Sequence, residues 1–185
     1  QPNDTTNERL MISFIIPSYN QQEYLPDAIE SALAQGVGEV IVIDDGSQDG
    51  SLDIARGYKE VRVVSQVNKG LASARNTGIM NAKHDWVFPL DADDVLLDHA
   101  GATMIEAMAR NPDADIIAPS FKCFGVRQDE IILSGSPTIE DFKTANRIGY
   151  FSCIRKSKLL EVGGYSPRMT YGFEDYHLWF DLLSR

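Results

Sequence analysis

Residues 12–35, ISFIIPSYNQQEYLPDAIESALAQ, carry the pattern from which the fold is predicted. The segment opens with the apolar run ISFII (12–16), which is typical of a buried strand and is interrupted by PSYN. Apolar residues then recur at helical spacing, which predicts a helix over 23–35 with one buried stripe, ended by Gly36 and Gly38. The stretch is therefore expected to form one strand–helix unit.

The same unit recurs through the first 95 residues or so. Apolar runs predict strands at 39–44, 61–66 and 85–90, and helices are predicted between them at 51–58 and 70–82. Alternating strands and helices are typical of a parallel sheet with right-handed crossovers. We therefore expect an α/β, Rossmann-like single domain with a mostly parallel central sheet.

The second half of the chain departs from this alternation. A helix is predicted over 99–110 and a strand over 114–124, and EIILSG (130–135) returns after a short turn as a hairpin. The remaining predicted elements are a strand at 149–156, a helix at 156–161, a loop at 163–172 and a last helix opened by FED, 173–175. The sheet is expected to become mixed toward the C-terminal half.

Composition narrows the possible functions. The 185 residues include 17 basic and 27 acidic side chains without a basic run, which argues against nucleic-acid binding. No apolar stretch approaches the ~18 residues of a transmembrane segment. Cys123 and Cys153 lack metal-type spacing, so free thiols in a reducing compartment are expected, with a disulfide as the alternative. Residues 1–10 are expected to form a polar tail. The chain is expected to be a fragment of a longer protein.

Three polar clusters follow predicted strands: PSYN (17–20), DDGSQDGS (44–51) and DADD (91–94). Ligands of parallel sheets bind at the carboxyl ends of the strands, where these clusters would meet. Each cluster is also compatible with an ordinary loop. Their convergence predicts a ligand site at this edge of the sheet.

The DADD cluster places three aspartates within four positions. A pair of like charges at ~4 Å costs about 1 kcal/mol in water and more at lower dielectric. Asp-x-Asp spacing brings two carboxylates within reach of one hard cation such as Mg²⁺ or Mn²⁺, with a diphosphate completing its shell. A polar turn that caps the following helix is an equally open interpretation.

Other candidate residues also have two interpretations. Asp45 can accept a hydrogen bond from a base N–H, or Asp44 and Asp45 can belong to a turn. Tyr19 offers a surface for base stacking or for packing. Lys69 and Arg75, near a predicted helix N-terminus, suit a phosphate or ribose, although Arg75 also suits a structural ion pair.

Glu174 and Asp175 stand at the start of the last predicted helix, behind a glycine-rich loop. Carboxylates at this position interact favourably with the helix dipole, which is one explanation for the pair. The other explanation is catalytic, with Asp175 as a general base within hydrogen-bond reach of an acceptor hydroxyl.

Five motifs in sequence resemble the family 2 glycosyltransferases with the GT-A fold: FIIPSYNQQEYLPDAIESALAQ, EVIVIDDGSQDGS, NKGLASARNTGI, FPLDADD and GGYSPRMTYGFEDYHLWFDLL. The resemblance implies a metal-dependent, inverting transfer from a nucleotide-diphospho-sugar, usually a UDP-sugar, to an acceptor hydroxyl. The acceptor would be a glycan, a lipid carrier or another hydroxyl compound, as in cell-envelope polysaccharide biosynthesis. A nucleotide-binding half (11–95) and an acceptor-side half (96–185) are expected, in the cytoplasm or at the inner face of the membrane through parts outside this chain.

The resemblance also implies roles for individual residues. The nucleotide-binding set consists of Pro17, Tyr19, Asp44, Asp45, Lys69, Arg75 and Asp91. Asp93 and Asp94 are expected to bind Mn²⁺ or Mg²⁺, and the motif leaves open which of them is the direct ligand. Asp175 matches the catalytic base and Glu174 its acidic neighbour.

Two other interpretations of the site remain open. VFPLDADDVL (87–96) also resembles the first motif of haloacid-dehalogenase phosphatases, in which Asp91 would be a nucleophile and Asp93 an acid/base. That motif normally sits on the first strand, whereas here it follows three strand–helix units. The third interpretation is a non-catalytic module that binds a nucleotide sugar or a glycan.

Overall fold

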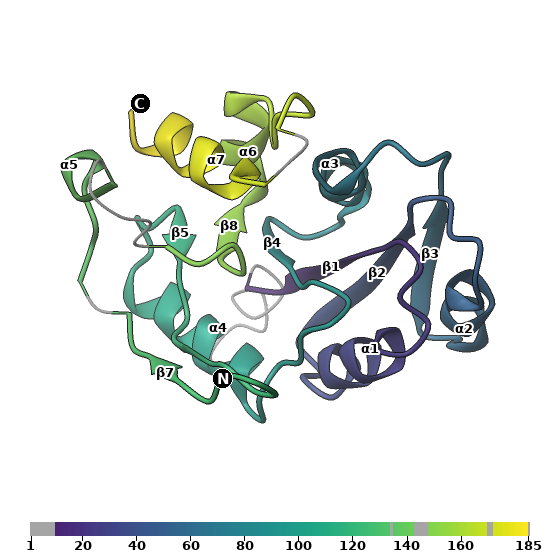
Figure 1. Ribbon diagram of the computed structural model, residues 1–185. Helices are drawn as coiled ribbons and strands as arrows, with labels where there is room; N and C mark the ends of the chain where they lie inside the picture. Colours follow the sequence, from purple (N-terminus) through teal and green to yellow (C-terminus); the bar gives the residue numbers. More distant parts are fainter. Residues whose placement is uncertain (1–9, 134, 143–147, 170–171, 185) are drawn as a thin grey trace.

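The computed structural model describes residues 10–133, 135–142, 148–169 and 172–184, so residues 1–9 of the predicted tail lie outside it (Figure 1). Its strands are β1 Ile12–Ser18, β2 Gly38–Asp44, β3 Val61–Ser65, β4 Trp86–Pro89, β5 Ile116–Ile117, β6 Phe121–Lys122, β7 Glu130–Ile131 and β8 Cys153–Arg155. Its helices are α1 Leu25–Leu33, α2 Ser51–Gly57, α3 Leu71–Asn81, α4 Ala100–Arg110, α5 Ile139–Phe142, α6 Lys156–Val162 and α7 Glu174–Leu183.

The central sheet has the strand order β3-β2-β1-β4-β8-β5. The strands from β3 to β4 are parallel, whereas β8 is antiparallel to both β4 and β5. The predicted mixed topology is therefore confirmed, as is the hairpin, which β6 and β7 form as a separate two-stranded sheet. The strand order reverses between β1 and β4, and such a switch point is where open α/β sheets bind ligands.

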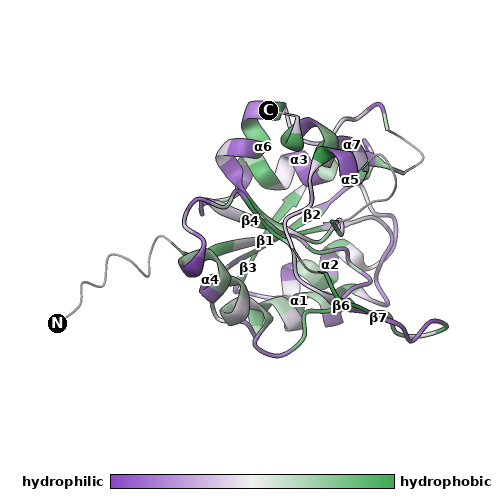
Figure 2. Ribbon diagram, turned by 90° about the vertical axis from the view of Figure 1, so that its left-hand side faces the viewer, coloured by the Kyte–Doolittle hydropathy of each residue, from purple (hydrophilic) through white to green (hydrophobic). Residues whose placement is uncertain are grey.

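Helices cover both faces of the sheet, so β1 is buried along its whole length (Figures 1 and 2). Alternate residues of the strand enter two different cores. Phe14 and Ile16 pack in the core of α1, α2 and α4, whereas Ile15 packs in the core of α3, α6 and α7. This layering explains the continuous apolar run from which the strand was predicted.

Helix α3 lies unusually close to β1. A Cβ atom added at Gly78 would collide with the side chain of Ile15. Only a residue without a side chain permits this approach, and the approach fixes the height of α3 above the sheet. Arg75 lies one turn earlier on the same helix, so its position over the sheet is fixed as well.

Two strand predictions need correction. The strand predicted over 114–124 is divided into β5 and β6, which belong to different sheets. Pro119 lies between them and has no N–H to continue a ladder. The strand predicted over 149–156 is paired only at Cys153–Arg155, and in the preceding chain Ser152 Oγ donates to the carbonyl of Gly149.

Strand β1 includes Pro17 and ends at Ser18, although the sequence predicted a break at Pro17. The pairing with β4 stops at Ile15, which faces Pro89. The missing N–H of Pro17 therefore lies where no strand is present on that side, and the proline does not interrupt the sheet. Helix α5 was not predicted, since four residues are too few to show a helical period.

Both cysteines are free thiols, Cys153 buried in β8 and Cys123 half-buried. Within the described residues, none of the helices combines the length and the apolar character needed to cross a bilayer.

Candidate functional site

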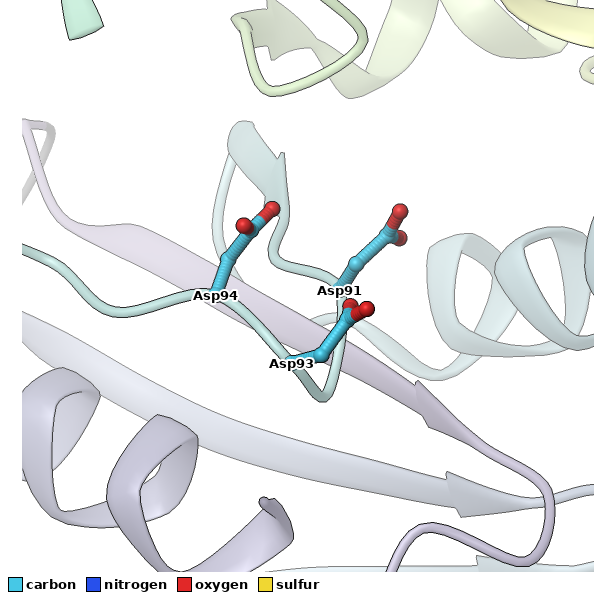
Figure 3. Close-up of side chains that lie close together, drawn as sticks. All are labelled: Asp91, Asp93 and Asp94. Atoms are coloured by element: carbon cyan, nitrogen blue, oxygen red, sulfur yellow. The ribbon is translucent and has the colours of Figure 1, made fainter. Parts of the chain in front are cut away.

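The DADD turn forms an acidic cluster directly after β4. The carboxylate oxygens of Asp91, Asp93 and Asp94 lie within 4.8 Å of one another, and the three side chains project to the same side of the turn (Figure 3). The N–H of Asp94 donates to the carbonyl of Asp91 at 3.0 Å and closes the turn. Asp93 is exposed, whereas the other two are half-buried. The local backbone therefore brings three oxygen donors together.

The electrostatics of this cluster favour a cation. Burial raises the pKa of Asp94, and the neighbouring charges of Asp91 and Asp93 raise it further, against a hydrogen bond from Tyr150. Burial also raises the pKa of Asp91, although the guanidinium of Arg75 opposes the shift. A divalent cation would relieve this repulsion, and oxygen-only donors at this spacing fit Mg²⁺ or Mn²⁺.

Arg75 is buried between the two acidic motifs. Its Nη2 donates to Asp91 Oδ1 at 2.7 Å, and its Nη1 donates to Glu174 Oε1 at 2.6 Å. Its guanidinium also lies over the rings of Tyr165 and Tyr150, at 5.2 and 5.8 Å from their centroids. Burial alone would lower the pKa of Arg75, but the charges and hydrogen bond of Asp91, Tyr165 and Glu174 together outweigh burial and raise it. Of the two roles that the sequence suggested for Arg75, the structure shows the ion pair. Its contact with a nucleotide remains a prediction.

Asp45 closes the loop that leads into α3. Its Oδ1 accepts from Gln66 Nε2 at 2.7 Å and from the N–H of Lys69 at 3.0 Å, and its Oδ2 accepts from the N–H of Gly70 at 2.7 Å. A carboxylate offers about four acceptor positions, so these bonds leave room for one more donor. Asp44 accepts from the hydroxyl of Ser65 at 3.2 Å. Asp45 is only 3% exposed, so a base N–H would have to reach this one remaining acceptor position, and the predicted contact stays a prediction.

The residues of the PSYN motif lie beside Asp45. The N–H of Asp45 donates to the carbonyl of Ser18, and the N–H of Asn20 donates to Ser47 Oγ, so the loops after β1 and β2 are joined. Pro17 is buried, whereas 45% of Tyr19 is exposed. An exposed ring at a strand end suits stacking. Lys69 is also exposed, at the start of α3.

The two acidic residues at the start of α7 differ in burial. Glu174 is only 8% exposed and reaches Arg75. Asp175 is half-buried, and its charge contributes to the raised pKa of Tyr165, for which burial is the main cause. Glu174 therefore belongs to the buried ion pair with Arg75. Asp175, on the same turn of α7 as Glu174, lies near Tyr165.

Three residues of the site were missed by the sequence analysis. Tyr150 donates its hydroxyl to Asp94 Oδ2 at 2.5 Å, Gln66 holds Asp45, and Asn76 holds the chain at Tyr165 by two bonds of 2.8 Å. Asn76 directly follows Arg75, which was a usable signal. Tyr150 had no such signal, because its segment was interpreted as a strand.

Comparison with known proteins identifies the class. Residues 13–176 match the family described as Glycosyl transferase family 2. The chain belongs to this family. An uncharacterized glycosyltransferase of Haemophilus influenzae is 30% identical over 184 residues, covering 94% of this chain and 62% of that protein.

Further relatives carry more specific names. Poly-beta-1,6-N-acetyl-D-glucosamine synthase of Staphylococcus epidermidis is 35% identical over 178 residues, covering 85% of this chain and 42% of the synthase. S. aureus TarS 1–349, solved with UDP-GlcNAc, has a TM-score of 0.77 at 20% identity, covering 94% of this chain and 53% of that one. Pyrobaculum calidifontis mannosyltransferase PcManGT, solved with GDP-Man and Mn²⁺, has a TM-score of 0.65 at 19% identity, covering 92% and 51%.

These structural likenesses confirm the predicted fold. The chain spans between about two fifths and three fifths of the length of the two curated relatives named here.

Proposed function

We propose that this chain carries the donor site and the catalytic base of a glycosyltransferase that moves a sugar from a UDP-sugar to an acceptor hydroxyl with inversion. The observation that carries the proposal is the meeting of DADD and the start of α7 at the switch point of the sheet, joined by Arg75. UDP-GlcNAc is the first donor to test, because the S. epidermidis relative is named as a synthase of poly-beta-1,6-N-acetyl-D-glucosamine.

The donor needs a cation at this site. The cluster consists of acidic groups, and the cationic side chain that contacts it among the described residues, Arg75, is already engaged with Asp91 and Glu174. A diphosphate would be repelled by such a surface. Asp93 and Asp94 would hold Mn²⁺ or Mg²⁺, which supplies Lewis-acid neutralisation of the diphosphate charge.

Asp45 and Tyr19 would receive the nucleobase. The exposed ring of Tyr19 offers a stacking surface, and the remaining acceptor position of Asp45 suits a base that presents an N–H. Lys69, exposed at the start of α3, would lie along the nucleotide. These contacts orient the donor so that its anomeric carbon faces the acceptor.

Asp175 would act as the general base. Its carboxylate takes the proton of the acceptor hydroxyl while that oxygen attacks the anomeric carbon. The bond between this carbon and the diphosphate oxygen breaks on the opposite face, so the configuration inverts and nucleoside diphosphate leaves. The carboxylates of the base and of DADD come from different elements, which allows these separate tasks.

A phosphatase of the haloacid-dehalogenase type is not favoured. Its motif would sit on the first strand, whereas DADD follows β4. Its nucleophile would be Asp91, whose Oδ1 is held by Arg75. The family match over residues 13–176 also favours a glycosyltransferase over a phosphatase.

The test is transfer of radiolabelled GlcNAc from UDP-GlcNAc to water or to a β-linked GlcNAc oligosaccharide, with and without Mn²⁺. Metal-dependent release of UDP by the wild type, lost in Asp175→Asn, supports the proposal. Donor binding without release of UDP under every condition would favour a non-catalytic module instead.

A further inference from the structure

Arg75 connects two carboxylates that lie far apart in the sequence. It uses a different nitrogen for each, Nη2 for Asp91 and Nη1 for Glu174, and each ion pair is shorter than 2.8 Å. The exposed fraction of the side chain is 1% for Arg75, 11% for Glu174 and 23% for Asp91. The three groups therefore interact where water screens charges weakly.

The surroundings of the guanidinium hold it in place. The rings of Tyr150 and Tyr165 flank it. Asn76 fixes the backbone of Tyr165 through both its amide atoms. Arg75 Nε has no acceptor among the described residues, so both of the ion pairs depend on the two Nη atoms. The single charge is therefore shared between the DADD turn and α7.

We propose that Arg75 is a positioning residue through which Glu174, on α7, controls the affinity of the DADD cluster for a divalent cation. The inference rests on the proposed function and assigns to Glu174 a role that needs no contact with the cation. Glu174 attracts the guanidinium and so weakens the interaction between Arg75 and Asp91. The cluster thereby stays negative enough to bind a cation.

The direction of the effect follows from the shared charge. When Glu174 loses its charge, the guanidinium interacts with Asp91 alone, and the site as a whole becomes less negative. Both changes weaken cation binding. Linkage makes the coupling reciprocal, so a bound cation, by competing for Asp91, strengthens the hold of Arg75 on Glu174 and fixes the start of α7. Asp175 is the next residue on that helix.

The experiment is calorimetric titration of the metal-free protein with Mn²⁺. Glu174→Gln is compared with Asp181→Asn, which removes the same charge from the same helix at a position where the side chain is 38% exposed and paired with His177. We expect Glu174→Gln to raise the Kd for Mn²⁺ about fivefold or more, a typical coupling between sites. Asp181→Asn should change it less than about twofold, because a partly exposed charge is screened.

A double-mutant cycle isolates the part of the effect that passes through Arg75. In an Arg75→Met background, Glu174→Gln should raise the Kd for Mn²⁺ clearly less than in the wild type, because the lost charge of Glu174 still acts but no guanidinium remains to be redistributed. Arg75→Lys provides a second background that keeps the charge without the two-pronged donor, and the coupling should fall there too. Circular dichroism confirms that each variant is folded.

An equal effect of Glu174→Gln with and without Arg75 would overturn the inference, since it would reflect long-range charge alone. Unchanged Mn²⁺ affinity in Glu174→Gln would also overturn it, while metal-dependent UDP binding by the wild type would leave the proposed function standing. A wild-type protein that binds neither Mn²⁺ nor UDP would contradict both.

Discussion

Arg75 and Glu174, 99 positions apart in the sequence, form a buried ion pair of 2.6 Å that joins α3 to α7. The same guanidinium holds Asp91 at 2.7 Å. The acidic turn after β4 and the helix that carries Asp175 are thus fixed relative to each other by one side chain.

Replacing Arg75 by Met should destabilise the fold by about 3–5 kcal/mol, because the buried Glu174 and the half-buried Asp91 lose their partner. Urea unfolding measures the change. The matched control is Arg110→Met, whose ion pair with Glu106 is exposed on both sides and should contribute little. Equal losses of stability in the two variants would show that the buried ion pairs contribute no more to the free energy of unfolding than the exposed pair does.

Removing the hydroxyl of Tyr150 should weaken cation binding. In Tyr150→Phe the ring still contacts Phe151 and Arg75, but Asp94 loses the donor that orients it. Loss of such an outer partner typically costs about tenfold in metal affinity. The Kd for Mn²⁺ should therefore rise, whereas Tyr58→Phe, which removes a hydroxyl bound to Glu30, should leave it unchanged.

Acidification should weaken Mn²⁺ binding at a pH above the ordinary aspartate pKa of 3.8. The pKa of Asp94 is raised by burial and by its neighbours, and a cation binds only its ionised form. In the metal-free protein, by contrast, acidification should increase the contribution of Asp94 to the stability of the fold. A carboxyl with a raised folded-state pKa stabilises the fold at low pH, and this contribution is lost as pH rises through the raised pKa.

These two pH dependences are separable by experiment. Calorimetry at decreasing pH gives the Kd for Mn²⁺, and urea unfolding with EDTA gives the stability without metal. In Asp94→Asn both dependences should become shallower. A Kd that stays constant until the pH falls below 3.8 would contradict the raised pKa of Asp94.

Asp175→Asn should abolish turnover while donor binding persists. A general base typically contributes about 10²–10⁴-fold in rate, and its amide analogue cannot take the acceptor proton. The measurements are UDP release and UDP affinity on the same preparation. His177→Asn, at an exposed position on the same helix, serves as the control. Undiminished transfer by Asp175→Asn would exclude it as the base.

The first half of the fold was predictable from sequence because each of its elements carries its own periodic signal. The strand predicted at 12–16 is buried on both faces, and its apolar run shows this directly. The antiparallel strand β8 was harder to delimit, since its limits depend on where β4 and β5 pair with it. Pairing of this kind is a tertiary property that a single segment does not display.

The site was predictable to a different degree. The convergence of Asp91, Asp93 and Asp94 followed from their spacing and is confirmed. The link from Arg75 to Glu174 was not, because it depends on how α3 and α7 pack. Sequence reasoning offered a structural ion pair for Arg75 but did not name its partners. Tyr150 was missed for the same reason, since it reaches Asp94 from a turn far along the chain.

If DADD binds the donor through a cation, UDP binding measured by calorimetry must depend on Mn²⁺. The comparison includes Asp93→Ala and, as a control, Asp98→Ala, an exposed aspartate shortly after the cluster. We predict that the wild type and Asp98→Ala bind UDP only with Mn²⁺ and that Asp93→Ala loses at least about tenfold in affinity, ~1.4 kcal/mol. Metal-independent UDP binding that Asp93→Ala leaves intact would exclude a cation at DADD as the link to the donor.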